Sequence, residues 1–291
     1  METHASAADA YQAALQYLDQ QQMQEAEIIL GELLNRFPQK LRYHEAMLEA
    51  LFRQGKTEQA FDVVRALMDR FKLTNDPAYD AIYIDGLRAT TNSPLPLGRI
   101  VRFYELVKQF QRILPLTGDV VECGCYRGMS SFLLCSYLRN HNVGFNGSGY
   151  HIFDSFQGLG EPTTEDEIPH GHKDARRLQK MSGPGNFSAS LETVQRNLSA
   201  FPGIKYHPGW IPLTFRCLPE KNYRFVHVDV DLYDPTWDCL EYFYPRLVMG
   251  GALVSDDYGW PGARKAIKEF CVERRIEVNV TGFNQAILFK T

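Results

Sequence analysis

The second part of the chain alternates between two sequence patterns, and this alternation is the strongest constraint on its fold. From Thr117 onward, short apolar runs typical of buried strands are followed by longer segments with apolar residues at helical spacing. Strands that alternate with helices predict a mainly parallel, doubly wound sheet. The last two apolar runs have no helix between them, so we expect an antiparallel hairpin through Thr281-Gly-Phe283.

The elements of this α/β region can be placed by their apolar pattern and by the turn residues between them. Strands are predicted near residues 119–123, 149–153, 203–207, 224–230, 250–255, 275–280 and 284–290. Helices are predicted near residues 128–140, 188–200, 235–247 and 261–274. The predicted fold class is an α/β, Rossmann-like sheet, mostly parallel, with a C-terminal antiparallel hairpin.

The first part of the chain predicts only helices. Residues 7–73 have apolar positions at helical spacing and almost no strand signal. The triplets Gln24-Glu25-Ala26 and Glu58-Gln59-Ala60 lie 34 residues apart, and each is expected to open the second helix of a pair. A 34-residue period with a small residue where paired helices touch resembles a tetratricopeptide repeat.

We therefore predict three regions: a helical, tetratricopeptide-like region at 1–76, a helical bridge at 77–116, and an α/β domain at 117–291. Two interpretations of residues 7–73 are open. The helices either support the α/β domain, or they present a surface for a protein partner or for self-association.

Composition excludes several classes of partner. The net charge of −4 and the absence of a basic stripe argue against nucleic-acid binding. No apolar run is long enough to span a membrane, and no secretory signal is visible at the start. The 6 cysteines are scattered without a Cys-x-x-Cys pair, which favours reduced thiols. We expect a cytoplasmic protein.

A glycine-containing turn follows the first predicted strand. Glu122 leads into Cys123-Gly-Cys-Tyr-Arg-Gly128, and a helix begins directly afterwards. Gly124 permits a tight turn with close backbone approach, which a cofactor bound at the first strand end requires. The pattern Glu-x-Gly-x-x-x-Gly is the form used by S-adenosylmethionine enzymes, in which the acid faces the cationic end of the cofactor. Such glycines are also common as purely structural features of strand-to-helix turns.

The second predicted strand, Tyr150–Phe153, ends at Asp154. An acid at this position, about 30 residues after a glycine turn, can hydrogen-bond both hydroxyls of a ribose. The alternative is that Asp154 caps a turn. The spacing and the position in the fold both favour the ribose.

Two pairs of acids follow later apolar runs. Asp229-Val-Asp231 comes after one predicted strand and Asp256-Asp257 after the next, so we expect all four at the carboxyl edge of the sheet. Asp229 and Asp231 have the same parity, which predicts side chains on one face. Clustered like charges resist joint ionisation, and a divalent cation relieves this. Oxygen-only ligands suit Mg²⁺. The alternative is that one or two of these acids cap turns.

With these residues in view, the chain from about residue 88 to 290 closely resembles the macrocin O-methyltransferase family. Its members depend on S-adenosylmethionine and Mg²⁺ and methylate sugar hydroxyls of natural products. The matching segments occur in order along the chain and include Val120–Gly128, Phe153–Leu159, Pro208–Trp210, Val228–Tyr233 and Asp256–Gly259. The resemblance implies a class I methyltransferase sheet.

The resemblance also implies roles for residues. Asp229, Asp256 and Asp257 would hold the metal, and Asp231 would be the general base. The expected cofactor-binding residues are Glu122, Gly124, Cys125, Tyr126, Arg127, Gly128, Ser130, Asp154, Ser155, Phe156, Gly209 and Trp210. The expected acceptor is a small molecule with a hydroxyl group, on a sugar or a related secondary metabolite.

The acceptor is the least constrained part of this prediction. The segment after Gly160 runs through His170-Gly-His172 to Gly183-Pro-Gly185 and is expected to form a mobile lid that sets the acceptor's shape. Family members commonly have a Trp where this chain has Ala286-Ile-Leu-Phe289. Two alternatives stay open: a catechol-type aromatic O-methyltransferase, and a non-catalytic binding module.

Overall fold

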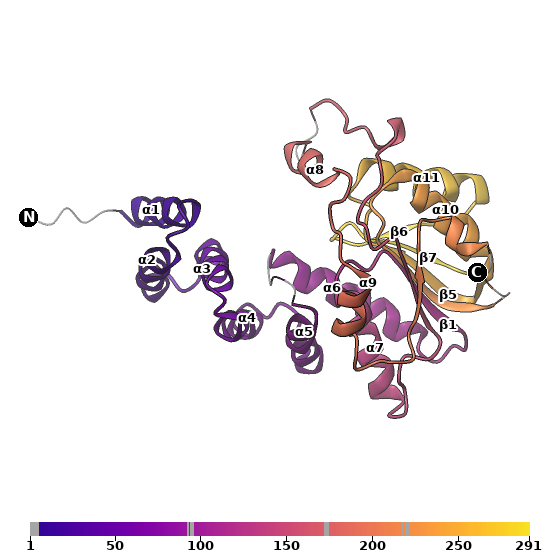
Figure 1. The fold of residues 1–291 in the computed structure, drawn as a ribbon, viewed down its shortest axis with the longest axis horizontal. Coiled ribbons are helices and arrows are strands. Elements are labelled where there is room, and N and C mark those ends of the chain that lie inside the picture. Colours follow the sequence, from indigo (N-terminus) through magenta and orange to yellow (C-terminus); the bar gives the residue numbers. More distant parts are fainter. Residues whose placement is uncertain (1–5, 92, 94–95, 172–174, 217, 219–220) are drawn as a thin grey trace, which may run out of the picture. The chain divides into compact units, whose positions relative to one another are not determined.

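The computed structural model describes residues 6–291 apart from 92, 94–95, 172–174, 217 and 219–220 (Figure 1). The chain divides into two compact units. The helical unit comprises Met1–Arg88 and Asn92–Val101, and the α/β unit comprises Ala89–Thr91 and Arg102–Thr291. The region predicted as a helical bridge is thus divided between the two units.

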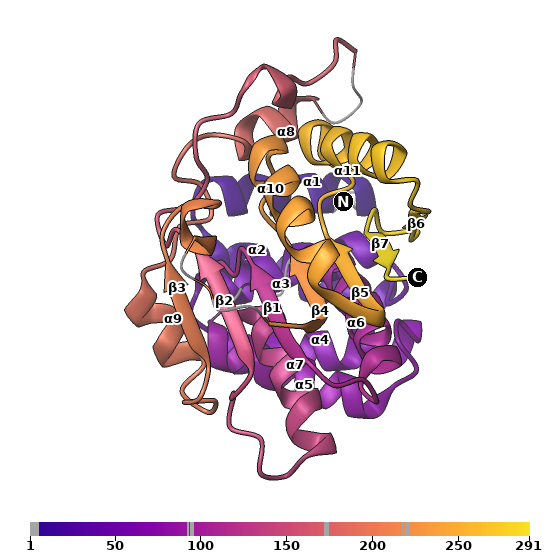
Figure 2. The same cartoon turned by 90° about the vertical axis from the view of Figure 1, so that its right-hand side faces the viewer.

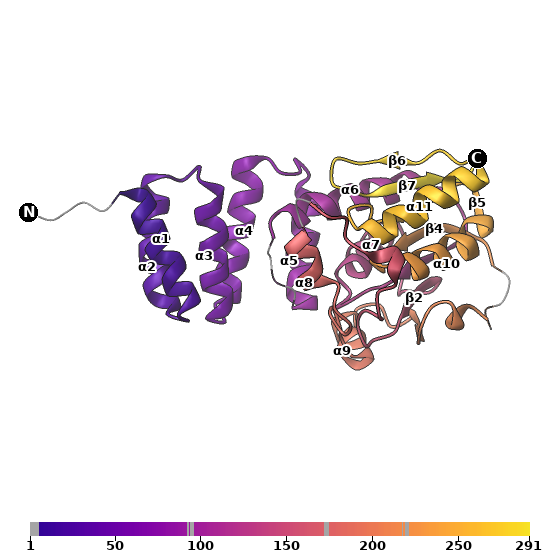
Figure 3. The ribbon, with the colours of Figure 1, turned by 90° about the horizontal axis from the view of Figure 1, so that it is seen from above.

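The helical unit is built from consecutive helices joined by short connections. They are α1 (Ala7–Asp19), α2 (Met23–Arg36), α3 (Leu41–Arg53), α4 (Thr57–Phe71) and most of α5 (Pro77–Thr90). Figure 3 shows α1 to α4 side by side. Ala26 and Ala60, the two small residues of the 34-residue period, are both fully buried, as a close helix contact requires. The predicted helical region is confirmed, and its assignment as a tetratricopeptide repeat stays a prediction.

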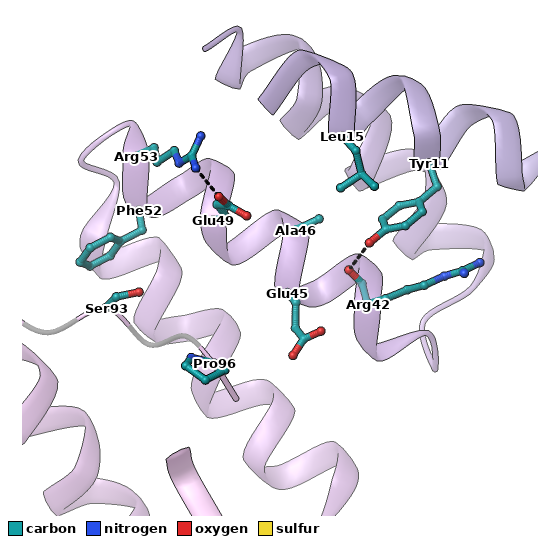
Figure 4. Close-up of a pocket in the computed structure, with 10 residues that line it drawn as sticks. All are labelled: Tyr11, Leu15, Arg42, Glu45, Ala46, Glu49, Phe52, Arg53, Ser93 and Pro96. Carbon is teal, nitrogen blue, oxygen red and sulfur yellow. Dashed lines mark hydrogen bonds and ion pairs between the residues drawn. The ribbon is translucent and has the colours of Figure 1, made fainter. Parts of the chain in front are cut away.

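The helical unit also has an open cavity of about 540 Å³. Its lining comes mainly from α1 and α3, with Ser93 and Pro96 on the opposite side (Figure 4). Several of the charged side chains that line the cavity already contact other protein groups. Arg53 and Glu49 form an ion pair of 2.5 Å, and the guanidinium of Arg42 lies 4.9 Å from the ring centre of Tyr11.

The α/β unit contains a seven-stranded sheet with the order β3-β2-β1-β4-β5-β7-β6 (Figure 2). Neighbouring strands pair in parallel except for β7, which is antiparallel to β5 and β6. The strands are β1 (Asp119–Cys123), β2 (Tyr150–Asp154), β3 (Lys205–Pro208), β4 (Tyr223–Val228), β5 (Leu247–Ser255), β6 (Asn279–Val280) and β7 (Ala286–Phe289). The predicted parallel sheet with its C-terminal hairpin is confirmed.

Helices cover both faces of the sheet. The helices after α5 are α6 (Gly98–Ile113), α7 (Met129–His141), α8 (Ala175–Met181), α9 (Leu191–Asn197), α10 (Tyr233–Phe243) and α11 (Pro261–Arg274), with 3₁₀ turns η1 (Thr164–Asp166), η2 (Leu213–Phe215) and η3 (Tyr244–Arg246). One core contains Val121 and Val226 of the sheet with Phe243 of α10 and Phe270 of α11. On the other face, Phe110 of α6 packs edge-on against Phe225 at 5.0 Å.

The alternation of side chains along β1 and β4 explains this arrangement. Val121 and Val226 point to the face that α10 and α11 cover, while Glu122 and His227 point to the opposite face. The strand order reverses between β1 and β4, so the carboxyl edge at this point is where α/β sheets bind ligands. Within the described residues, no helix is both long and apolar enough to cross a membrane.

The element bounds differ from the prediction mainly at the ends. The strand predicted at 275–280 is reduced to β6, because Arg275 adopts a left-handed conformation with φ of 57° where α11 ends. Helix α9 begins later than predicted because Ser190 caps it, accepting a hydrogen bond from the backbone N–H of Thr193. The helix α8 and the turn η1 were not predicted, since the segment after Gly160 is polar and lacks helical periodicity.

Candidate active site

The carboxyl edge of the sheet brings together the acids that follow β4 and β5. Val228 at the end of β4 is in register with Ser255 at the end of β5. The ladder continues beyond both strands, because the N–H of Asp229 donates to Cys123 and the N–H of Asp256 donates to Val228. The backbones of Asp229 and Asp256 therefore lie next to each other.

Asp231 reaches this cluster through a turn and not through the strand pleat. Strand β4 ends at Val228, and Asp231 has a φ of 62°, in the left-handed region that Asp tolerates better than most residues. Its backbone N–H donates to Oδ2 of Asp257 at 2.9 Å. Carboxylate oxygens of Asp229, Asp231 and Asp257 all lie within 4.8 Å of one another. The sequence predicted that alternation along one strand would place Asp229 and Asp231 on the same face. Both residues lie beyond the end of β4, so the turn, and not the strand, brings their side chains together.

A half-buried arginine lies at the centre of the acids. Nη2 of Arg102, on α6, is 2.7 Å from Asp256, 3.4 Å from Asp229 and 4.0 Å from Asp257. Sequence analysis did not identify this residue. The sequence does contain a signal for it, because Arg102 lies at helical spacing from the buried residues Leu106 and Ile113 and therefore on the inward face of the helix.

Asp256 is held on its other side by a buried polar chain. His227 lies between Glu122 and Asp256, with its Nδ1 2.9 Å from Glu122 and its Nε2 3.4 Å from Asp256. Gln285 donates to Asp256 Oδ1 at 2.7 Å. His227 and Gln285 are fully buried. Sequence analysis missed both, since His227 lies inside an apolar run and Gln285 precedes the last strand.

These partners divide the acids electrostatically. Burial alone would raise the pKa of Asp256, but Arg102 and His227 hold it well below its usual range. Burial and the Asp229 carboxylate raise the pKa of Asp231 to about 7. Burial, with the Asp231 and Asp229 carboxylates, raises the pKa of Asp257 well above its ordinary value. Protein side chains thus compensate the negative charge of Asp256, whereas the charges of Asp231 and Asp257 have no comparable compensation.

This arrangement fits a divalent cation. One cationic nitrogen already lies within 4.0 Å of Asp229, Asp256 and Asp257, so the three carboxylates converge on a common point. Oδ1 of Asp257 is buried and accepts no hydrogen bond among the described residues. Oxygen donors without partners in a site of excess negative charge suit Mg²⁺. A second group of donor atoms, from His227, Asp229 and Asp256, also lies within 4.8 Å.

The glycine turn after β1 packs directly on the acidic turn. Gly124 has a φ of 80°, and a Cβ there would overlap the carbonyl oxygen of Asp229. Asp154, at the end of β2, accepts hydrogen bonds from the N–H groups of Cys125 and Phe156, each at 2.7 Å. Asp154 therefore ties the turn after β1 to the turn after β2. Each carboxylate oxygen keeps a second lone pair for a ligand.

Glu122 differs from the other expected cofactor-binding residues because it is fully buried. Its Oε2 accepts hydrogen bonds from the hydroxyls of Ser131 and Tyr150, and Nδ1 of His227 lies against its Oε1. The contacts of Glu122 are thus internal, and a direct contact with a cofactor stays a prediction.

The remaining expected cofactor-binding residues surround the same edge. Tyr126 and Trp210 are 37% and 41% exposed, unusual for large aromatic side chains, and both follow a strand end. An exposed aromatic face suits the stacking of a flat ring. Ser130 is buried in the first turn of α7, and Gly128 precedes that helix with a φ of 88°. Arg127 donates to the carbonyl oxygen of Thr91, while Ser155 and Gly209 lie in the turns after β2 and β3.

The segment predicted as a lid is partly structured. It contains η1 and α8, and its residues 163–166 contact α10 and α11. His172 lies outside the described residues, and His170 is in a loop. No described metal-ligand group includes His170.

The strand order, the glycine turn after β1 and the ligand edge at the reversal define a class I methyltransferase fold. The structure resembles that of the O-methyltransferase NovP, with a TM-score of 0.52 and 26% identity over 66% of this chain and 80% of that one. It also resembles the calicheamicin methyltransferase CalS11 in fold, with a TM-score of 0.54 and 17% identity over 74% of this chain and 93% of that one.

The family described as macrocin-O-methyltransferase (TylF) matches residues 98–290, and the chain belongs to it. Mycinamicin III 3''-O-methyltransferase of Micromonospora griseorubida is 32% identical over 157 residues, 53% of this chain and 60% of that protein. Demethyldecarbamoylnovobiocin O-methyltransferase of Streptomyces niveus is 31% identical over 158 residues, 53% of this chain and 58% of that protein. The chain thus spans about 60% of the length of these relatives.

Proposed function

We propose that the chain is an S-adenosylmethionine- and Mg²⁺-dependent O-methyltransferase that acts on a hydroxyl of a natural-product sugar or a related secondary metabolite. The convergence of Asp229, Asp256 and Asp257 on one cationic nitrogen carries this proposal. The family assignment supports methyl transfer, and the mycinamicin and novobiocin relatives support a hydroxylated acceptor.

The proposal gives each part of the site a task. Bound Mg²⁺ would lower the pKa of an acceptor hydroxyl, and S-adenosylmethionine would supply an electrophilic methyl group. Asp229, Asp256 and Asp257 would hold the metal, with Asp256 oriented by Arg102, His227 and Gln285. Asp231 would accept the hydroxyl proton, a role that its raised pKa of about 7 suits.

The cofactor would lie along the turns after β1, β2 and β3. Asp154 would bind the ribose while holding the N–H groups of Cys125 and Phe156 in place. Exposed Tyr126 and Trp210 would bracket the cofactor's rings. Aligned reactants can lower a barrier by ~7–11 kcal/mol, so this positioning would be a major part of catalysis.

The remaining parts of the proposal concern location and partners. The 5 described cysteines (Cys123, Cys125, Cys135, Cys239 and Cys271) are buried and free, which supports a reducing, cytoplasmic location. Cys217 lies outside the described residues. Residues 7–73 would either support the α/β domain, or bind a protein partner or a second copy of the chain.

A methyl-transfer screen tests the activity. The purified chain would be incubated with labelled S-adenosylmethionine and a panel of glycosides and phenols, with Mg²⁺ or with EDTA. We expect label in at least one glycoside, only when Mg²⁺ is present. Transfer to phenols alone would indicate a catechol-type enzyme. Calorimetry that detected no S-adenosylmethionine binding would remove the basis of the proposal.

A further inference from the structure

The turn Asp229–Tyr233 is held from outside by a residue of the segment predicted as a lid. Oδ1 of Asp166 accepts a hydrogen bond from the backbone N–H of Tyr233 at 2.7 Å. Tyr233 is the first residue of α10, and its own helix provides no side-chain cap. Asp166 therefore caps α10 from a site 67 positions earlier in the chain. A carboxylate is well placed there because it faces the positive end of the helix dipole.

Asp166 is itself fixed by its own turn. Its Oδ2 accepts from the backbone N–H of Thr163 at 2.9 Å and from the Thr163 hydroxyl at 3.2 Å. Thr163 and Asp166 together form a capping box around η1. Both carboxylate oxygens thus have defined donors, one within the segment and one in the turn that carries Asp231.

The space for this carboxylate is provided by Gly262, in the first turn of α11. A Cβ at Gly262 would overlap Oδ1 of Asp166 and come within 3.1 Å of the Tyr233 nitrogen. Gly262 is buried, and its φ is not in the left-handed region, so conformational freedom does not explain a glycine here. The close approach of Asp166 does explain it.

The docked segment has a second, exposed contact with α11. Glu165 forms an ion pair with Lys265, and Lys265 lies 5.7 Å from the ring centre of Tyr233. Both charged side chains are more than a third exposed. An exposed pair of this kind contributes little to stability, so the part-buried bond of Asp166 is the stronger connection.

Two carboxylates hold the backbone of the turn, in addition to its internal bond from the N–H of Leu232 to the carbonyl oxygen of Val230. Asp257 accepts from the N–H of Asp231 at 2.9 Å, and Asp166 accepts from the N–H of Tyr233 at 2.7 Å. Asp257 lies just after β5, whereas Asp166 belongs to the segment after β2. Between these bonds, Asp231 is in the left-handed conformation, which surrounding contacts must maintain.

We propose that Asp166 is a positioning residue that couples docking of residues 163–166 to the conformation of the turn Asp229–Tyr233. When the segment is docked, the Asp166 bond fixes the residue two positions after Asp231. When it undocks, the Tyr233 N–H loses its acceptor and the turn loosens. This rests on the proposed function, because Asp231 is the proton acceptor there. Docking of the segment around an acceptor would thus complete the base.

The test compares Asp166→Ala and Gly262→Ala with the matched control Glu165→Ala. Glu165→Ala removes the neighbouring ion pair and leaves the Asp166 bond intact. We expect exchange of the Tyr233 backbone amide to accelerate at least tenfold in both Asp166→Ala and Gly262→Ala, and less than twofold in Glu165→Ala. With an acceptor from the screen above, kcat should fall at least tenfold in the first two variants, with unchanged S-adenosylmethionine affinity.

Amide exchange needs no acceptor molecule, so it tests the coupling between Asp166 and the turn even if no methyl transfer is found. Absence of methyl transfer would count against the proposed function and not against this coupling. Unchanged Tyr233 exchange in Asp166→Ala would overturn the inference. An equal acceleration in Glu165→Ala would also overturn it, because general loosening of the segment would then explain the effect. Gly262→Ala keeps the carboxylate, so it provides the decisive comparison if Asp166→Ala unfolds.

Discussion

The guanidinium of Arg102 lies 2.7 Å from the carboxylate of Asp256, and this pair joins α6 to the acidic edge of the sheet. The same nitrogen is within 4.0 Å of Asp229 and Asp257. Arg102 therefore supplies positive charge where a metal ion is proposed. An ion and a guanidinium that face the same acids repel each other, so Arg102 would weaken the binding of the proposed metal.

Arg102→Gln should make the protein less stable without metal and more responsive to it. Loss of the guanidinium leaves buried carboxylates uncompensated, and we expect the free energy of unfolding in EDTA to fall by roughly 1–3 kcal/mol, given partial exposure of the arginine. Denaturant unfolding with and without Mg²⁺ measures this. The control is Lys108→Gln, which removes an ion pair with Glu105 and a contact with the Tyr104 ring but touches none of the acids at the sheet edge. A smaller Mg²⁺ effect in Arg102→Gln than in the parent would contradict the prediction.

Asp231→Asn should remove the proton acceptor while preserving the turn. The bond to Asp257 uses the backbone N–H of Asp231, so the substitution leaves it in place. We expect kcat to fall by about 10²–10⁴-fold, the range for general base catalysis, with little change in S-adenosylmethionine affinity. Steady-state kinetics and calorimetry measure the two quantities. Activity within threefold of the parent would exclude Asp231 as the base.

Much of the fold could be predicted because its signals are local. The apolar runs that became β1, β2 and β4 are bounded by turn residues, and their alternation with helices determines a parallel sheet. The position of the acids followed from this, since carboxyl ends of neighbouring parallel strands share one edge. The shortening of the strand predicted at 275–280 to β6, and the turn η1, have no such local signal and could not be predicted.

The parts of the site that sequence reasoning missed depend on distant partners. Arg102 and Asp256 come from different elements, and only the folded sheet brings α6 to β5. His227 was not recognised because a single polar residue within the apolar run Phe225–Val228 is assigned to the core. Its role becomes visible only when its neighbours Glu122 and Asp256 are known. Glu122 was identified from its motif, but its burial depends on the packing of α7 against the sheet.

Gly124→Ala should disrupt the site more than its backbone conformation alone explains. A Cβ would overlap the carbonyl of Asp229, in addition to the strain of a left-handed φ. Gly55 is the matched control, because it is also left-handed, with a φ of 72°, but has open space around it. We expect Gly55→Ala to cost about 1 kcal/mol and Gly124→Ala about 3 kcal/mol or more.

Chemical denaturation of the two variants measures this difference, and calorimetry should show loss of S-adenosylmethionine binding in Gly124→Ala alone. Equal destabilisation by the two substitutions would mean that the close approach to Asp229 is relaxed in solution.

His207 should make the protein less stable in mild acid. Its ring stacks on Phe153 at 4.2 Å, and its Nε2 lies 3.0 Å from Nδ1 of His151, whose other nitrogen contacts Asp119. Burial, then His151 and the nearby lysines Lys205 and Lys221, lower the pKa of His207 from 6.5 to about 4. The unfolded chain therefore binds a proton that the folded chain does not, between pH 6.5 and 4.

The contribution of neutral His207 to the free energy of unfolding is thus fully present above pH 6.5 and is lost as the pH falls toward 4. A shift of this size, discounted for partial exposure of the ring, corresponds to about 1–2 kcal/mol. His207→Phe keeps a flat ring on Phe153 and removes the titration, so it should flatten the fall in unfolding free energy between pH 7 and 5. Denaturant unfolding at both pH values measures the slope. An unchanged slope in His207→Phe would assign the acid sensitivity to other groups, because Phe cannot take up the proton.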